Sequence, residues 1–172
     1  MAKTIFHVSA AQMIQSRRED VASATKNLRT MRANRAALSR SARVVNRIVS
    51  LGKTLSDNCD AYVYASVAWD DSVRIRGSIT VGNMLSLTGP TIGKLVQAMR
   101  TAGFDRCGEP EKHADQYNAN MTIEFRRESD GIRTDIPLRF ELAEDGTDGA
   151  TCKKVQVGVE LREVPKFEIV CS

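Results

Sequence analysis

The chain has 172 residues, of which 42% are hydrophobic and 5% aromatic, so it is long enough to bury one sizeable core and short for two. No apolar run approaches the roughly 20 residues that a membrane-spanning helix needs, which argues against a helical membrane protein. The chain lacks the charged start and apolar run of a secretory signal, and its cysteines have no paired spacing. We therefore expect a soluble, cytoplasmic protein with reduced thiols at Cys59, Cys107, Cys152 and Cys171.

The net charge of +4 hides a division between two parts of the chain. Residues 1–53 contain eleven Lys and Arg against two acidic residues, a net charge of +9, whereas residues 54–172 have a net charge of −5. We interpret 1–53 as a basic helical N-terminal region and 54–172 as an α+β domain, together one cooperative unit. Such asymmetry favours a polyanionic partner, or docking of one part on the other.

Residues 17–51 are predicted to form one long helix, preceded by a short one near 10–15. Two capping-box patterns, "SAAQ" and "SRRE", mark the two starts, and Gly52 stands where a helix-ending glycine belongs. Apolar residues recur with a 3-4 spacing over 21–49, interrupted once by Arg35. At 1.5 Å per residue such a helix would be about 50 Å long, so we expect it to protrude, bend or meet a partner.

This helix offers two candidate surfaces. The side away from the apolar seam carries arginines without acids, whose mutual repulsion a phosphate backbone would relieve while counterions are released. The arginines that we predict to contact nucleic acid are Arg29, Arg32, Arg40, Arg43 and Arg47. The seam is a candidate protein–protein interface, formed by Leu28, Met31, Arg35, Leu38 and Val45. An ordinary domain helix, with its stripe packed on the protein's own sheet and its charges in water, also fits.

Residues 61–69 and 73–81 alternate between apolar and polar around "DDS", which predicts a β-hairpin with a three-residue loop. We expect Trp69 to lie opposite Val73 on the apolar face of this hairpin. The other face combines aromatic side chains with arginines, a composition typical of surfaces on which single-stranded nucleic acid stacks. Its candidate binding residues are Tyr62, Tyr64, Arg74 and Arg76.

The remaining elements complete an α+β domain. Residues 88–103 predict a helix, and the polar residues 104–120 predict a long loop. Alternating apolar residues then predict strands over 121–127, 132–142 and 155–161, with an extra strand over 167–170. We expect these strands to form a 3–4-stranded antiparallel meander in one sheet. Their other faces mix charges as solvated faces do, with Glu124, Arg126, Arg139 and Glu141 among them. Pro137 donates no hydrogen bond, which predicts an edge strand or a bulge.

No catalytic motif is found. The stretch "GPTIGK" is one residue shorter than a phosphate-binding loop, and Leu95 stands where that loop has Ser or Thr. Cys107, His113 and Asp115 lack the closely spaced ligand pairs that zinc sites use. We therefore expect a non-enzymatic protein without metal or cofactor, although an acid–base pair formed in space would leave no motif.

The sequence favours a nucleic-acid-binding accessory protein. Its contacts would be directed at the backbone and weakly sequence-specific, because arginine spacing carries no base code. The alternative is a self-assembling structural or adaptor protein that uses the N-terminal helix as its interface. We expect nucleic acid, single strands included, or an acidic protein surface as the partner, a homo-oligomer, and no membrane.

Overall fold

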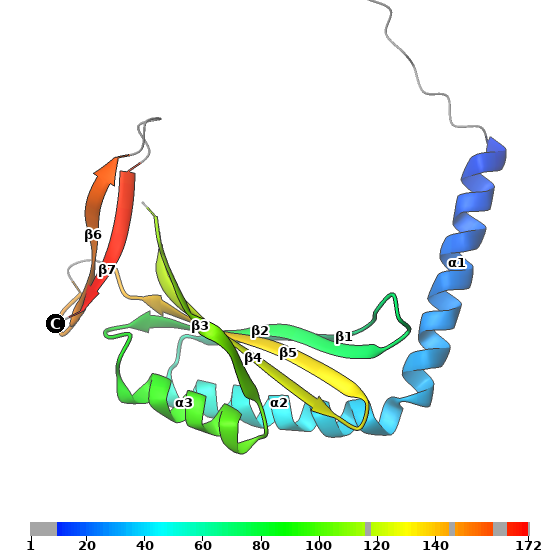
Figure 1. The fold of residues 1–172 in the computed structure, drawn as a ribbon, viewed down its shortest axis with the longest axis horizontal. Coiled ribbons are helices and arrows are strands. Elements are labelled where there is room, and N and C mark those ends of the chain that lie inside the picture. Colours follow the sequence, from blue (N-terminus) through cyan, green and yellow to red (C-terminus); the bar gives the residue numbers. More distant parts are fainter. Residues whose placement is uncertain (1–9, 116–117, 145–146, 160–164, 172) are drawn as a thin grey trace, which may run out of the picture.

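The computed structural model describes residues 10–115, 118–144, 147–159 and 165–171, which contain three α-helices and seven β-strands (Figure 1). In chain order these elements are α1 (Ala10–Ala33), α2 (Arg35–Leu55), β1 (Cys59–Val67), β2 (Val73–Met84), α3 (Pro90–Thr101), β3 (Asp105–Ala114), β4 (Ala119–Ser129), β5 (Ile132–Leu142), β6 (Cys152–Val159) and β7 (Pro165–Cys171). The predicted α+β class is confirmed. Ser9, which begins the "SAAQ" pattern, lies outside the described residues.

A five-stranded sheet forms the centre of the molecule, with the strand order β1-β2-β5-β4-β3. Neighbouring strands run antiparallel except β2 and β5, which run parallel. The strands β6 and β7 form a separate two-stranded sheet. The prediction of one antiparallel meander is therefore wrong. A parallel pair needs a long crossover connection, which α3, β3 and β4 supply here, and such a non-local pairing leaves no signal in local periodicity.

The predicted long helix is instead two helices, which meet at Asn34 with φ −95° and ψ 10°. The chain bends sharply at this point, so α1 projects from the end of the sheet while α2 lies against it (Figure 1). α2 buries one face, formed by Ala37, Ser41, Val45, Ile48 and Gly52, whereas most of α1 is exposed. The 3-4 seam over 21–49 is therefore not one continuous stripe.

Gly52 does not end a helix, because α2 continues to Leu55. A Cβ atom at Gly52 would lie 2.6 Å from Cys59 Sγ, which is too close for any real contact. The glycine therefore permits close packing of α2 on β1, and the prediction of a helix stop at this position is wrong.

The predicted hairpin forms, but its register differs by two residues from the expected one. Val67 pairs with Val73 and Ala65 with Ile75, while Trp69 lies in the loop and is fully exposed. Ala68 N–H donates to the Ser72 carbonyl oxygen at 2.9 Å and closes this loop. Because side chains alternate with a period of two, a two-residue shift keeps each of them on its expected face.

Two further predictions about the strands are wrong. The polar residues expected as a loop contain β3, an edge strand that is exposed on both faces and so lacks an apolar alternation. Pro137 lies in β5, a central strand, instead of at an edge. The β2–β5 pairing skips from Asp135 to Leu138, so the missing N–H of Pro137 falls in a gap of the ladder.

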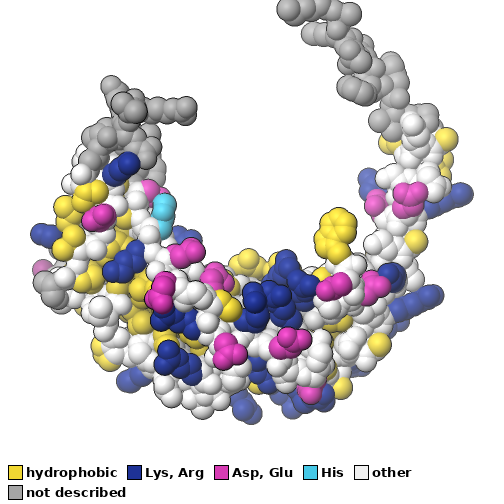
Figure 2. Space-filling model, in the orientation of Figure 1, with side chains coloured by type: hydrophobic (Ala, Val, Ile, Leu, Met, Phe, Trp, Pro, Cys, Tyr) yellow, Lys and Arg dark blue, Asp and Glu magenta, His cyan; other side chains and the backbone are white. Residues whose placement is uncertain are grey.

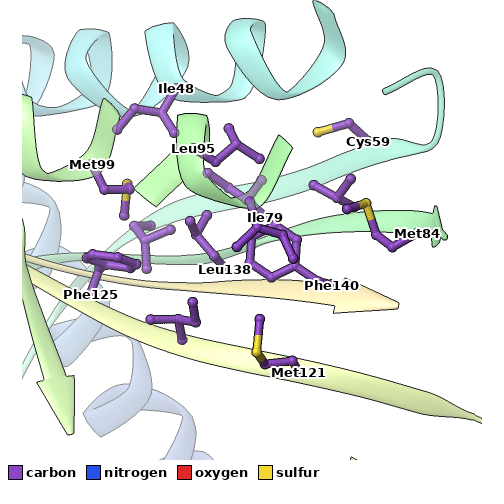
Figure 3. Packing of buried hydrophobic residues seen from close by; sticks show 14 of the residues in the cluster. Ile48, Cys59, Ile79, Met84, Leu95, Met99, Met121, Phe125, Leu138 and Phe140 are labelled. Atoms are coloured by element: carbon purple, nitrogen blue, oxygen red, sulfur yellow. The ribbon is translucent and has the colours of Figure 1, made fainter. Parts of the chain in front are cut away.

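The core lies between the sheet and the two helices α2 and α3. Ile48 and Leu95 from the helices point toward Ile79, Leu138 and Phe140 on the strands (Figure 3). These five side chains are buried, and most of the cluster is aliphatic, as the low aromatic content requires. This packing covers one face of the sheet and leaves the other face free.

Cys152 and Cys171, expected as free thiols, form a disulfide that joins β6 to β7. They lie directly opposite each other in the β6–β7 register although they are 19 residues apart, a pairing that their spacing does not reveal. Cys59 and Cys107 are free. None of the described helices is both long and apolar enough to cross a membrane.

Candidate nucleic-acid interface

The face of the five-stranded sheet opposite α2 and α3 is open. It forms the floor of a concavity between α1 at one end and the β6–β7 sheet at the other (Figure 1 and Figure 2). Side chains on this face form rows across the strands. One row contains Tyr64, Arg76, Asp135, Arg126 and Asp105. A neighbouring row contains Ser66, Arg74, Arg133 and Glu128.

The parallel pairing of β2 with β5 brings together arginines that are far apart in the sequence. Arg74 lies beside Arg133, and Arg76 is separated from Arg126 only by Asp135. Figure 2 shows basic side chains gathered over the middle of the concave floor. We call this surface the Tyr–Arg patch, formed by Tyr62, Tyr64, Arg74, Arg76, Arg126 and Arg133.

The two tyrosines of the patch lie with their rings parallel. The centroids of the Tyr62 and Tyr64 rings are 6.0 Å apart and the ring planes differ by 8°. The two residues are 64% and 47% exposed, respectively, so a large part of the aromatic surface remains in water. An exposed aromatic ring on a sheet offers a face on which an unpaired base stacks.

Arg76 lies directly opposite Tyr64 in the β1–β2 register and is exposed. Within the described parts of the chain it forms no ion pair, unlike Arg74, whose Nη2 lies 3.1 Å from Asp70 Oδ2. Arg76 therefore presents an uncompensated positive charge beside an aromatic ring, a combination suited to a phosphate and its base.

Arg126 and Arg133 share one carboxylate. Arg126 Nε lies 2.8 Å from Asp135 Oδ1, and Arg133 Nε lies 2.8 Å from Asp135 Oδ2. Burial alone would raise the pKa of Asp135, but the hydrogen bonds from Arg126 and Arg133 lower this pKa below its usual value. Asp135 thus stays ionised at neutral pH, and the three residues together keep one net positive charge.

The patch has an acidic boundary toward β3. Asp105 and Glu111 lie on the open face of β3, and Glu124 lies on the same face of the neighbouring strand β4. Burial raises the pKa of the Glu124 carboxyl, and the nearby charges of Glu111 and Asp135 raise it further. Arg74, Arg76 and Arg133 of the open face therefore lie on β2 and β5, away from the acidic residues of β3.

A shallow hollow of about 340 Å³ adjoins the patch, between the hairpin loop and the two hairpin strands. Tyr64, Trp69, Arg74 and Arg76 are among its lining residues. The sequence does not identify Trp69 as a site residue, because the alternation of the neighbouring strand predicts that its side chain lies on the apolar face. The available signal was its position beside the "DDS" loop.

The predicted helix arginines lie on two different helices and do not all share a surface with the patch. Arg29 and Arg32 lie on α1, whereas Arg43 and Arg47 lie on the outer side of α2, beneath the covered face of the sheet. Arg40 Nε lies 2.9 Å from Asp130 Oδ2 in the β4–β5 turn, so its charge is compensated. Arg47 lines a hollow of about 840 Å³ between α2 and α3. The bend at Asn34 separates these arginines, which a straight helix would have kept on one side.

The predicted interface residues are also divided. Val45 is buried in the protein's own core, and Leu38 packs against a small cluster that includes Val73. Arg35 is exposed at the start of α2 and occupies no buried position. On α1, Leu28 is exposed and Met31 is half-buried. Of the predicted seam, Leu28 and Arg35 are therefore exposed, Met31 and Leu38 are half-buried, and Val45 is closed to a partner.

The structure supplies no metal site in the ranges it describes, where no three His, Cys, Asp or Glu residues are grouped to hold an ion. His113 Nε2 lies 3.2 Å from Asp115 Oδ2 on an exposed strand end.

No protein-family model, curated protein or solved structure matches this chain. Function is therefore inferred from the geometry of the site.

Proposed function

We propose that this protein is a non-enzymatic nucleic-acid-binding protein that holds a single strand on the Tyr–Arg patch. The observation that carries the proposal is the exposed, parallel pair of Tyr62 and Tyr64 beside the unpaired Arg76. Aromatic rings bind bases, and arginines neutralise phosphates, so the patch contains the two components of a single-strand platform.

A single strand suits this surface better than a duplex. Stacking on Tyr62 or Tyr64 requires a base whose face is free, and the bases of a duplex are already stacked on their neighbours. Arg76 lies one strand from the tyrosines and Arg126 three strands from them, and neighbouring strands are about 4.8 Å apart. The charges are thus spread across the floor, as contacts along a backbone require. Such contacts carry little sequence information.

The helix arginines have a secondary role in this proposal. Arg43 and Arg47 are exposed but lie on the opposite side of the sheet from the patch. They raise the positive potential of the molecule and so increase the rate of encounter with a polyanion. They do not contact the strand that lies on the patch.

Fluorescence anisotropy with labelled single-stranded oligonucleotides over a salt series tests the proposal. The affinity of the wild type should fall as salt rises, because phosphate contacts release counterions. Arg76→Gln should weaken binding by about 3- to 10-fold and reduce the magnitude of the log–log salt slope by about 0.7.

Arg43→Gln is the matched control, since it removes the same charge from an exposed arginine on the far side of the sheet. Its effect should be clearly smaller than that of Arg76→Gln. Equal effects of the two variants, or no salt-sensitive binding even at low salt, would contradict the proposal.

Self-assembly through α1 is a second candidate function. It is favoured by the exposure of large apolar residues on α1, three of which, Ile14, Val21 and Leu28, recur at intervals of seven. Residues seven apart lie on one side of a helix, as in a helical interface. This candidate predicts a concentration-dependent oligomer that Leu28→Glu dissociates and Arg76→Gln leaves intact, measured by light scattering.

A further inference from the structure

The outer edge of β1 carries unpaired backbone groups. Ala68 N–H donates to the Ser72 carbonyl oxygen, and hydrogen-bonded pairs alternate along an antiparallel ladder. Residues 62, 64 and 66 therefore form backbone hydrogen bonds with β2. The odd-numbered residues from 61 to 67 direct their backbone N–H and C=O groups outward, away from β2. Among these groups, Ala61 N–H donates to Asp60 Oδ1 at 2.8 Å. No backbone bond between the described residues satisfies the others.

Beyond Asp60 at its start, this edge lacks the features that usually protect an edge strand. Residues 61–67, "AYVYASV", contain no charge and no proline, and their pairing with β2 has no bulge. β-branched and aromatic residues favour strand pairing. α1 contacts β1, but Val63 at the middle of the strand is 36% exposed.

The opposite edge of the same sheet is protected. β3 contains Pro110, has a register irregularity between Cys107 and Glu111, and carries charged side chains along its length. The strand β7 also lies near its end, where Lys112 and Phe167 line a common hollow. The contrast between the two edges identifies β1 as a surface for strand addition.

The chemistry of β1 fits a second copy of itself. β1 extends over nine residues, Cys59–Val67, and Val63 is its midpoint. Antiparallel pairing about Val63 places Tyr62 opposite Tyr64 of the second copy, and Ala61 opposite Ala65. Odd residues then meet odd residues, so the outward N–H and C=O groups pair with one another. Ala61 N–H exchanges the Asp60 carboxylate for the carbonyl oxygen of Ala65 in the second copy. Asp60 falls opposite Ser66, so no like charges face each other.

We propose that two copies of the chain associate through antiparallel pairing of β1 with β1 about Val63. The product is a dimer with one continuous ten-stranded sheet. The two-fold axis is perpendicular to the sheet, so both open faces lie on the same side and the tyrosines of the two copies become neighbours. This inference does not depend on nucleic-acid binding.

Sedimentation velocity over a range of concentrations tests this interface. The wild type should show a monomer–dimer equilibrium. Val63→Lys should raise its dissociation constant at least tenfold, because two lysines would lie directly opposite at the axis. The neutral, nearly isosteric Val63→Thr should keep the dimer, and far-UV circular dichroism verifies that both variants fold.

Cysteine cross-linking gives an independent readout. Paired residues of antiparallel strands have Cα atoms close enough for a disulfide, so Val63→Cys in a Cys107→Ser background should yield a covalent dimer under mild oxidation. Glu109→Cys, on the exposed β3 edge, should not. A monomer at all concentrations would overturn the proposal. Dissociation by Leu28→Glu but not by Val63→Lys would overturn it in favour of α1.

Discussion

The two faces of the five-stranded sheet have opposite chemistry, although the same strands form both. On β5, Ile136, Leu138 and Phe140 are fully buried under the helices, while the alternating Asp135 and Arg139 face the open side. One face holds the fold together, and the other presents charge and aromatic surface to water. Substitutions on the two faces should therefore separate stability from binding, which makes the comparison testable residue by residue.

The largest expected effect is on the covered face. Phe140 is fully buried in the core, and Phe140→Ala should lower the free energy of unfolding by about 3–5 kcal/mol because it removes a large side chain and leaves a cavity. Urea denaturation measures this change. A loss below about 1 kcal/mol would show that this face does not carry the stability.

A substitution at Gly77 should disturb both faces of the sheet. Gly77 lies on β2 directly opposite Val63 of β1, so a larger residue there displaces β1. A Cβ atom at this position would collide with the backbone carbonyl oxygen of Tyr62, so Gly77→Ala should destabilise the fold by about 1–3 kcal/mol. Gly93→Ala in α3 is the control, since nothing lies within 4 Å of a Cβ there. That variant should be neutral or stabilising by up to about 1 kcal/mol in the same assay.

On the open face, Asp135→Asn should change stability and binding in opposite directions. The substitution removes the negative charge shared by Arg126 and Arg133 and replaces one of the two acceptor oxygens with an NH2 donor, which should lower the free energy of unfolding near pH 7 by about 1 kcal/mol. It also leaves both guanidinium charges uncompensated, so oligonucleotide affinity should rise. A fall in affinity would show that the patch needs the carboxylate for its geometry.

The pH dependence follows from the lowered pKa of Asp135. A carboxyl group with a depressed pKa stabilises the fold above its ordinary pKa of about 3.9, and this contribution disappears as the pH falls through the lower value of the folded state. The stability difference between wild type and Asp135→Asn should therefore shrink below about pH 4. A difference that stays constant in urea titrations from pH 7 to pH 3 would contradict the assigned hydrogen bonds.

The smallest effect on stability is expected at Tyr64, which is exposed on an edge strand. Tyr64→Ala should cost less than about 1 kcal/mol of stability but weaken single-strand binding several-fold, because a stacked base is worth about 1–3 kcal/mol. Tyr64→Phe keeps the ring and should keep the affinity. Anisotropy titrations of the two variants that agree with each other would argue against stacking.

The hairpin half of the site was predictable from the sequence. Tyr62, Tyr64 and Arg76 lie on one face because strand alternation has a period of two, and the two-residue error in register preserves that face. The other half was not predictable, because Arg126 and Arg133 reach the patch through the parallel pairing of β2 with β5. The sequence predicts only a solvated face for Arg126, since local periodicity gives no information about which strands become neighbours.

The helical predictions failed for a different reason. The bend at Asn34 stands beside Arg35, where the 3-4 pattern is interrupted, but no glycine or proline there indicates a helix end. The sequence predicts a helix end at Gly52, because nothing in it shows that Cys59 packs against this glycine. In both regions the folded chain departs from the helix boundaries that the local sequence pattern predicts.

The chain's single tryptophan offers the most direct measurement of where nucleic acid binds. Trp69 is fully exposed and lines the hollow beside Tyr64 and Arg76, so its fluorescence reports contact with the Tyr–Arg patch. Titration with a single-stranded oligonucleotide should change Trp69 emission with the same midpoint as the anisotropy signal, and added salt should reverse both. Binding seen by anisotropy with unchanged Trp69 emission would place the nucleic acid on α1 or α2 and contradict the proposed site.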